Sequence, residues 1–342
     1  MSERVRAALA TIVDGGTLTM DEARDAMGEV MDGEATPAQL AALLMGLRMR
    51  GETVDELAGF AAAMRERVVR VTAPTGTIDV VGTGGDGSGT FNISTTAALV
   101  VAAAGVPVAK HGNRAITSKS GSADVLDALG VRIDHDAASA SAALDTIGFA
   151  FLFAPAFHPA MKHAGPTRRE IGVRTAFNLV GPLTNPAGAT RQLLGVGDGA
   201  LAPRMAAAAQ RLGTERTFVI HGAGVDELPL DGSGALYDVT PDTIDRRDVV
   251  ASAMGLASTP TGRLAGGTAA ENAAATEATL RGEPGARRDV VLLNAAAALE
   301  VAGAVDDLAA GIDRAALTID AGLATSLLER LRAERRAAGT PA

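Results

Sequence analysis

The chain has 342 residues, of which 47% are apolar, so it can bury a core in one or two domains without disulfides. It contains no cysteine, which excludes disulfide frameworks, thiolate nucleophiles and zinc–thiolate sites. The formal net charge of −9 argues against general nucleic-acid affinity, although a local cluster of donors can still bind a small anion. The first residues lack a hydrophobic signal core, and no apolar stretch is long enough to span a bilayer. We therefore expect a cytoplasmic protein.

The first seventy residues predict helices with clearly marked starts. A threonine stands three residues before Glu or Gln in the pairs Thr19 and Glu22, Thr36 and Gln39, and Thr53 and Glu56. This is the spacing of a capping box, in which each side chain satisfies a backbone donor of the other residue. We expect residues 1–71 to form a helical domain.

After residue 72, short apolar segments alternate with helical ones. Strands are predicted over residues 77–81, 106–109, 131–133, 149–153, 193–196 and 217–221. Helices are predicted over residues 95–104, 123–129, 137–147, 203–212, 271–280, 289–301 and 323–335. This alternation predicts a mainly parallel sheet with helices on both faces. We expect an α/β domain over residues 72–159 and 189–342, while about 160–188 contributes to the helical domain.

A glycine-rich loop, residues 82–90, follows the first predicted strand and precedes a helix. There, backbone N–H groups and a helix N-terminus can hold a phosphate, and glycine lets the backbone come close to it. A Walker loop is excluded because no Lys-Ser or Lys-Thr follows. Gly82, Gly84 and Gly87 match the dinucleotide pattern, but its acidic ribose-binding residue is missing after the next strand, where Lys110 stands. A flexible turn is the alternative; we favour a loop for a different phosphate donor.

Two further polar segments follow predicted strands. The motif Lys110-His-Gly-Asn-Arg114 should lie beside the glycine loop at the same sheet edge, followed by hydroxyl-bearing residues 117–122. Asp226 and Glu227 follow the strand at 217–221, which we expect to be a neighbouring strand end. Adjacent carboxylates facing a phosphate site are ligands that Mg²⁺ prefers. Solvated surface residues are the alternative for both segments.

Eight motifs in sequence carry a resemblance to a known family. They are Gly82-Thr-Gly-Gly-Asp86, Asn92-Ile-Ser-Thr95, Lys110-His-Gly-Asn-Arg114, Ser120-Gly-Ser-Ala-Asp124, His158-Pro-Ala-Met161, Arg168-Arg-Glu170, residues 174–186 from Arg-Thr-Ala-Phe to Thr-Asn-Pro, and Gly224-Val-Asp-Glu227. In order and spacing, over essentially the whole chain, they resemble the anthranilate phosphoribosyltransferases. The resemblance implies an α/β fold with a small N-terminal helical domain and a larger α/β domain of the nucleoside phosphorylase and phosphoribosyltransferase type.

The resemblance also implies a reaction, partners and site residues. The reaction is transfer of phosphoribose from phosphoribosyl pyrophosphate (PRPP) to anthranilate in tryptophan biosynthesis, by a homodimer joined through the helical domain. PRPP would be bound by Gly82, Gly85, Asp86, Thr90, Asn92, Ile93, Ser94, Thr95, Lys110, His111, Gly112, Asn113, Arg114, Ala115, Ile116, Thr117, Ser118 and Ser122. Anthranilate would be bound by Gly82, Asn113, His158, Arg168 and Gly181, with Arg168 pairing its carboxylate. Two Mg²⁺ ions would be held by Ser94, Asp226 and Glu227.

No residue is predicted to act as a strong general base, so positioning and metal electrostatics are expected to drive the reaction. Three other functions stay open from the sequence. One is a pyrimidine nucleoside phosphorylase, which has this architecture but takes free phosphate and a nucleoside. The second is a non-catalytic paralogue that binds ligands. The third is a transferase acting on another aromatic amine.

Overall fold

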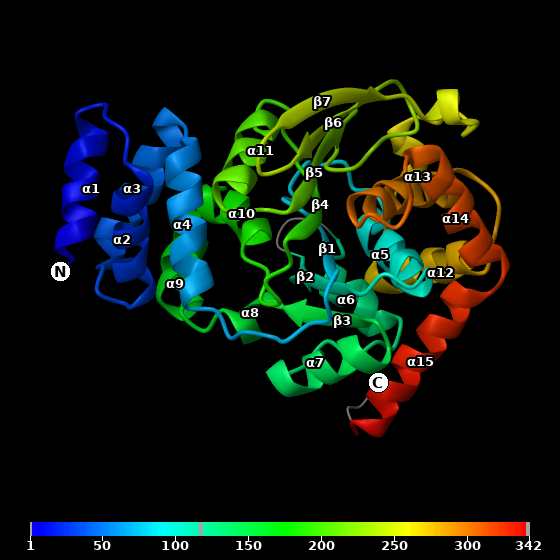
Figure 1. Cartoon of the computed structure of the whole chain (residues 1–342). Helices are drawn as coiled ribbons and strands as arrows, with labels where there is room; N and C mark the ends of the chain where they lie inside the picture. The colour runs from blue at the N-terminus through cyan, green and yellow to red at the C-terminus, as the bar shows by residue number, and fades with distance from the viewer. Residues whose placement is uncertain (1, 116–118, 340–342) are drawn as a thin grey trace.

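The computed structural model describes residues 2–115 and 119–339, and the chain begins with a bundle of helices (Figure 1). The bundle helices are α1 (Glu3–Val13), α2 (Met20–Met31), α3 (Pro37–Arg50) and α4 (Val54–Glu66). All three predicted capping boxes are present, at the starts of α2, α3 and α4. The leucine side chains of α3 and α4 pack into one core with α1 and α2. The predicted helical start is confirmed.

A segment from the middle of the chain returns to this bundle. The short helix α8 (Ala154–Phe157), which packs on residues 149–153, precedes it, and the segment itself holds α9 (Met161–Ile171) and α10 (Ala176–Val180). Helix α9 packs on α2 and α3, and α10 packs on α3 and α4. The imidazole of His163 lies so close to Gly33 that a Cβ there would be 2.7 Å from the ring. Helices α9 and α10 thus pack on the helical bundle, and the division into domains stays a prediction.

The rest of the chain is built on a seven-stranded sheet in the order β3-β2-β1-β4-β5-β6-β7. The strands are β1 (Ile78–Gly82), β2 (Val108–Gly112), β3 (Phe149–Phe153), β4 (Arg191–Gly195), β5 (Arg216–Gly222), β6 (Gly234–Val239) and β7 (Ile244–Val249). Strands β1 to β5 are parallel, while β6 and β7 are antiparallel. The mainly parallel sheet is therefore confirmed.

Helices cover both faces of the sheet (Figure 1). They are α5 (Ile93–Ala103), α6 (Ser122–Ala128), α7 (Ala137–Thr146), α11 (Ala202–Arg211), α12 (Ala269–Leu280), α13 (Ala286–Val301), α14 (Leu308–Asp320) and α15 (Leu323–Ala337). Alternate strand residues point to opposite faces: Ile78 and Val80 pack with α5, α13, α14 and α15, whereas Val81 packs with the core that includes α10 and α11. Across the described ranges, no helix is long and apolar enough to cross a membrane.

Three features differ from the sequence prediction, one of which is that helix α14 was not predicted. Residues 131–133 form no strand, so that prediction is wrong. Val131 is buried, but its N–H donates to Leu126 O and its carbonyl accepts from Arg335, so its backbone is satisfied without a sheet partner. The antiparallel hairpin of β6 and β7 was not predicted. Residues 244–248 of β7 are exposed, so that strand lacks the apolar alternation that marks a strand in sequence.

Candidate active site

Three neighbouring strands, β2, β1 and β4, end in glycine at one edge of the sheet. Gly82 of β1 pairs directly with Gly195 of β4. The segment after β5 folds back over these two strand ends. A Cβ on Gly82 would overlap Asp226 Oδ2, and a Cβ on Gly195 would overlap the Asp226 backbone. Glycine at both positions therefore makes room for the carboxylate of Asp226 above the sheet edge.

The two carboxylates meet the glycine loop and the start of α5. Gly84 N–H donates to Asp226 Oδ2 at 2.8 Å, and Ser94 N–H donates to Glu227 Oε1 at 3.0 Å. The expectation that these groups follow neighbouring strands needs correction, because β4 lies between β1 and β5. The carboxylates reach the loop because the turn after β5 crosses the end of β4.

The charges at this edge are poorly solvated. Burial, and then the charge of Asp86, raise the pKa of Asp226 to about 6. Burial and the neighbouring Asp226 raise the pKa of Glu227, while Lys110 opposes this. Lys110 is itself buried, and its Nζ donates to Val80 O at 2.6 Å. Two mutually repelling carboxylates with hard oxygen donors fit Mg²⁺, which takes few protein ligands and completes its shell with water or substrate.

A cavity of about 780 Å³, here called the loop cavity, opens beside these groups. It is lined by twelve of the predicted PRPP residues: Gly82, Gly85, Asn92, Ser94, Thr95, Lys110, His111, Gly112, Asn113, Arg114, Ala115 and Ser122. Asp226 lines it as well. Ile116, Thr117 and Ser118 lie outside the described residues. The sheet edge thus gathers most of the predicted donor residues around one space.

Three residues that were predicted to bind PRPP lie outside the lining of the loop cavity. Asp86 turns back on its own loop, accepting from Ser88 N at 3.0 Å. Thr90 forms an isolated β-bridge with Ala265. The side chain of Ile93 is buried in the hydrophobic core. None of the three lines the loop cavity as the structure stands.

Several residues that were predicted to bind PRPP form hydrogen bonds or ion pairs with partners that the sequence did not indicate. Arg114 pairs with Asp124 at 2.8 Å and with Asp127 at 3.3 Å, so its charge is already engaged. Asn92 Oδ1 accepts from Asn272 Nδ2 at 2.9 Å, which ties the start of α5 to α12. Asn272 lies 180 residues further along the chain, and no local pattern announces the contact.

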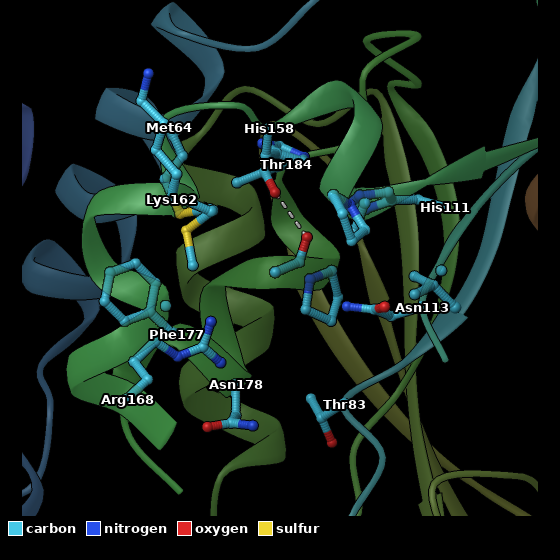
Figure 2. Close-up of a pocket in the computed structure, with 18 of the residues that line it drawn as sticks. Met64, Thr83, His111, Asn113, His158, Lys162, Arg168, Phe177, Asn178 and Thr184 are labelled. Atoms are coloured by element: carbon cyan, nitrogen blue, oxygen red, sulfur yellow. Dashed lines mark hydrogen bonds between the residues drawn. The ribbon is translucent and has the colours of Figure 1, made fainter. Parts of the chain in front are cut away.

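A second cavity of about 650 Å³, here called the arginine cavity, shares a wall with the loop cavity. All five predicted anthranilate residues line it: Gly82, Asn113, His158, Arg168 and Gly181. Figure 2 shows His111, His158 and Asn113 on one side and Arg168, Phe177 and Asn178 across from them. The sequence did not predict Met64, Thr83, Lys162, Arg169, Phe177, Asn178 or Thr184 in this lining. Met64 belongs to the helical bundle, so the cavity lies between the bundle and the sheet edge.

Arg168 brings an uncompensated charge to this cavity. Its guanidinium carbon lies 4.8 Å from the centre of the Phe177 ring, a contact typical of cation–π packing. Burial lowers the pKa of Arg168. Among the described residues Arg168 has no carboxylate partner. A half-buried guanidinium without a counter-ion suits a ligand carboxylate, which it can bind with two parallel hydrogen bonds.

The two histidines of the cavity are neutral. Burial, together with repulsion from His158 and Lys110, lowers the pKa of His111 to about 3. Burial lowers the pKa of His158 to about 4. The backbones of Gly181 and Thr184 hydrogen-bond the rings of His111 and His158, while neither Nε2 atom has a partner in the described structure. Each Nε2 is thus a buried atom whose hydrogen-bonding capacity is unused in the described structure.

Comparisons with known proteins agree with this geometry. Residues 74–325 match the model of the glycosyl transferase family α/β domain, and residues 6–68 match its helical bundle domain. Anthranilate phosphoribosyltransferase of Xanthobacter autotrophicus is 51% identical over 324 residues, covering 94% of each chain. The crystal structure of the Thermus thermophilus enzyme has a TM-score of 0.92 and 44% identity, covering 98% of this chain and 100% of that one.

A more distant solved structure is that of the Saccharomyces cerevisiae enzyme in complex with PRPP and Mg. It has a TM-score of 0.90 and 26% identity, covering 98% of this chain and 99% of that one. A second structure of the yeast enzyme contains 4-fluoroanthranilate, with a TM-score of 0.87 and 25% identity over 97% of this chain and 98% of that one. The fold, the two joined cavities and these similarities lead to one conclusion: the chain belongs to the anthranilate phosphoribosyltransferases, within the glycosyl transferase family of helical bundle and α/β domains.

Proposed function

We propose that this chain transfers the 5-phosphoribosyl group from PRPP to anthranilate, giving N-(5-phosphoribosyl)anthranilate and pyrophosphate in tryptophan biosynthesis. The observation that carries the proposal is the junction of the two cavities. One is lined by the glycine loop and Asp226, with Glu227 held against the backbone of Ser94, and the other is lined by Arg168, which has no ion pair among the described residues. The structures of the yeast enzyme that contain PRPP with Mg and 4-fluoroanthranilate support the choice of substrates.

In this proposal the loop cavity holds PRPP and the metal. The donor residues are those that the family resemblance implies, and Ser94, Asp226 and Glu227 hold two Mg²⁺ ions. Support comes from the positions of Ser94 and Asp226 in the cavity wall and from the Ser94 N–H bond to Glu227. Bound Mg²⁺ supplies positive charge against the negative charge that develops on pyrophosphate, an effect worth several kcal/mol.

The arginine cavity holds anthranilate. Arg168 binds its carboxylate, while Asn113, His158, Gly82 and Gly181 surround the ring and its amine. The amine nitrogen attacks the ribose carbon that carries pyrophosphate, with inversion. A C–N bond forms, the C–O bond breaks, its electron pair leaves with pyrophosphate, and the nitrogen releases one proton. Holding the two reactants in line can lower the barrier by about 7–11 kcal/mol, so positioning is the main contribution of the protein.

Mixing the purified chain with PRPP, anthranilate and Mg²⁺ tests the proposal. We expect anthranilate fluorescence to fall, equimolar pyrophosphate to appear, and both changes to stop when EDTA removes the metal. Phosphate consumption with thymidine or uridine, in place of this reaction, would instead identify a nucleoside phosphorylase. Binding of both substrates without turnover would identify a non-catalytic paralogue.

We also propose a homodimer joined through the helical bundle, in the cytoplasm. Val13 of α1 is 80% exposed and Met49 of α3 is 84% exposed, and these helices pack side by side. Large exposed apolar side chains on adjacent helices favour burial against a second copy. The absence of cysteine is compatible with a reducing compartment.

The dimer proposal predicts a shift in mass on substitution. In light scattering coupled to size-exclusion chromatography, the wild type should elute at twice the chain mass of 34.4 kDa. Val13→Glu with Met49→Glu should shift it toward the monomer, because two charges cannot be buried without partners. As a matched control, Leu317→Glu on α14, also exposed at 70%, should leave the dimer intact. A monomeric wild type would rule out this interface.

A further inference from the structure

The segment between α9 and α10 reaches into the glycine loop through one side chain. Arg174 Nη2 donates to Thr83 O at 3.0 Å, and Arg174 Nη1 donates to Gly84 O at 2.6 Å. The guanidinium thus bridges two successive carbonyl groups of the loop. From this geometry we propose that Arg174 is a positioning residue, which orients the glycine loop for the phosphates of the donor. The inference rests on the proposed role of the loop cavity.

Peptide planarity fixes the direction of one backbone N–H group in the glycine loop. In a trans peptide the carbonyl and the N–H point in opposite directions. The peptide between Thr83 and Gly84 is held at both ends, by Arg174 at its oxygen and by Asp226 at its N–H. The next peptide is held only at the Gly84 oxygen. Its Gly85 N–H therefore points away from the guanidinium, and it has no acceptor in the described structure. Gly85 lines the loop cavity, so this fixed N–H is available to an anion.

The shape of the loop gives the second step. A Cβ on Gly85 would overlap the Arg174 guanidinium, whereas a Cβ on Gly84 would meet nothing within 4 Å. The two glycines have similar left-handed conformations, with φ of +60° at Gly84 and +67° at Gly85. Backbone conformation disfavours a side chain at both positions, but only Gly85 leaves space for Arg174.

The anchoring of Arg174 gives the third step. Helix α9 ends at Gly172 in the left-handed conformation, and Thr175 starts α10 with its N–H bonded to Asn178 Oδ1 at 3.0 Å. Arg174 lies between these two fixed ends. Arg168 lies on the same α9. One segment therefore carries both the arginine proposed to bind anthranilate and the arginine that holds the glycine loop. The two substrate sites are thereby set relative to each other.

A double-mutant cycle tests the inference. Arg174→Ala is expected to raise the KM for PRPP about tenfold or more, with kcat and the KM for anthranilate changed less than about threefold. Arg174→Lys should have a KM for PRPP between those of the wild type and Arg174→Ala, because an ammonium cannot bridge both carbonyl groups as the planar guanidinium does. Gly85→Ala should raise the KM for PRPP well beyond Gly84→Ala, its matched control for backbone conformation. In the Arg174→Ala background this difference should largely disappear.

Hydrogen exchange gives a readout that does not depend on activity. Without substrates, amides of residues 83–88 should exchange faster in Arg174→Ala and Arg174→Lys than in the wild type, while amides of β1 stay protected. Wild-type exchange in this loop together with an unchanged KM for PRPP would overturn the inference. So would equal effects of Gly84→Ala and Gly85→Ala in the presence of Arg174. An inactive wild type would refute the proposed function, and loop exchange would still decide the role of Arg174.

Discussion

Asp226→Asn combined with Glu227→Gln is expected to leave a folded protein with at least about a thousandfold lower kcat/KM for both substrates. Losing metal ions that stabilise the leaving pyrophosphate removes several kcal/mol from the transition state, and every 1.4 kcal/mol is about a tenfold loss of rate. Steady-state kinetics at saturating Mg²⁺ measures this. The residual activity should no longer respond to added Mg²⁺.

The thermal stability of the double variant separates loss of activity through loss of metal from loss of activity through misfolding. The amide oxygens can still accept from the N–H groups of Gly84 and Ser94, which keeps the local hydrogen bonds. Burial raises the folded pKa values of both carboxyl groups, so their ionised forms are less stable in the native state than in the unfolded chain. The neutral variant should thus melt at or above the wild-type temperature. Asp242→Asn, an exposed carboxylate between β6 and β7, is the control and should keep full activity. Full activity in the double variant would refute the metal assignment.

Arg168→Ala is expected to raise the KM for anthranilate by roughly 10- to 100-fold, while the KM for PRPP changes little. A charge-assisted hydrogen-bonded pair contributes about 1.5–3 kcal/mol, and a carboxylate facing a neutral wall loses all of it. Arg168→Lys should recover only part of the loss, since an ammonium lacks the planar fork. Initial rates with each substrate varied in turn provide the measurement.

The same substitution carries its own structural check. Arg168 is half-buried without an ion pair among the described residues, so its removal costs only the packing on Phe177. The unfolding temperature of Arg168→Ala should stay close to that of the wild type. As a control, Arg67→Ala breaks an ion pair with Asp32 in the helical bundle and removes a side chain that lines neither cavity, so it should leave both KM values unchanged. An equal rise in both KM values for Arg168→Ala would contradict the proposal that Arg168 binds the carboxylate of anthranilate.

Local signals in the sequence predicted much of this fold. The capping boxes at Thr19, Thr36 and Thr53 span four residues each, so the sequence alone specifies them. The glycine loop was placed correctly after β1 because parallel strands present their carboxyl ends at one edge. Helix α14 was missed, although Asp307 caps its start and was a usable signal.

Other features depend on contacts that no local pattern encodes. Asp226 crosses β4 because Gly82 and Gly195 lack side chains, a relation visible only once the strand order is known. Met64 and Phe177 reach the same cavity from distant parts of the chain. The sequence predicted Lys110 as a ligand of PRPP, but it did not indicate that the ammonium group donates to Val80 O within the sheet.

A crystal structure of the protein with PRPP and Mn²⁺ in place of Mg²⁺ would locate both the metal and the donor substrate, because manganese can be identified by its anomalous scattering. We expect a manganese peak beside Asp226 and Glu227, with the pyrophosphate between this peak and the backbone of Gly85. Metal and pyrophosphate bound away from the ends of β1 and β4 would contradict this expectation.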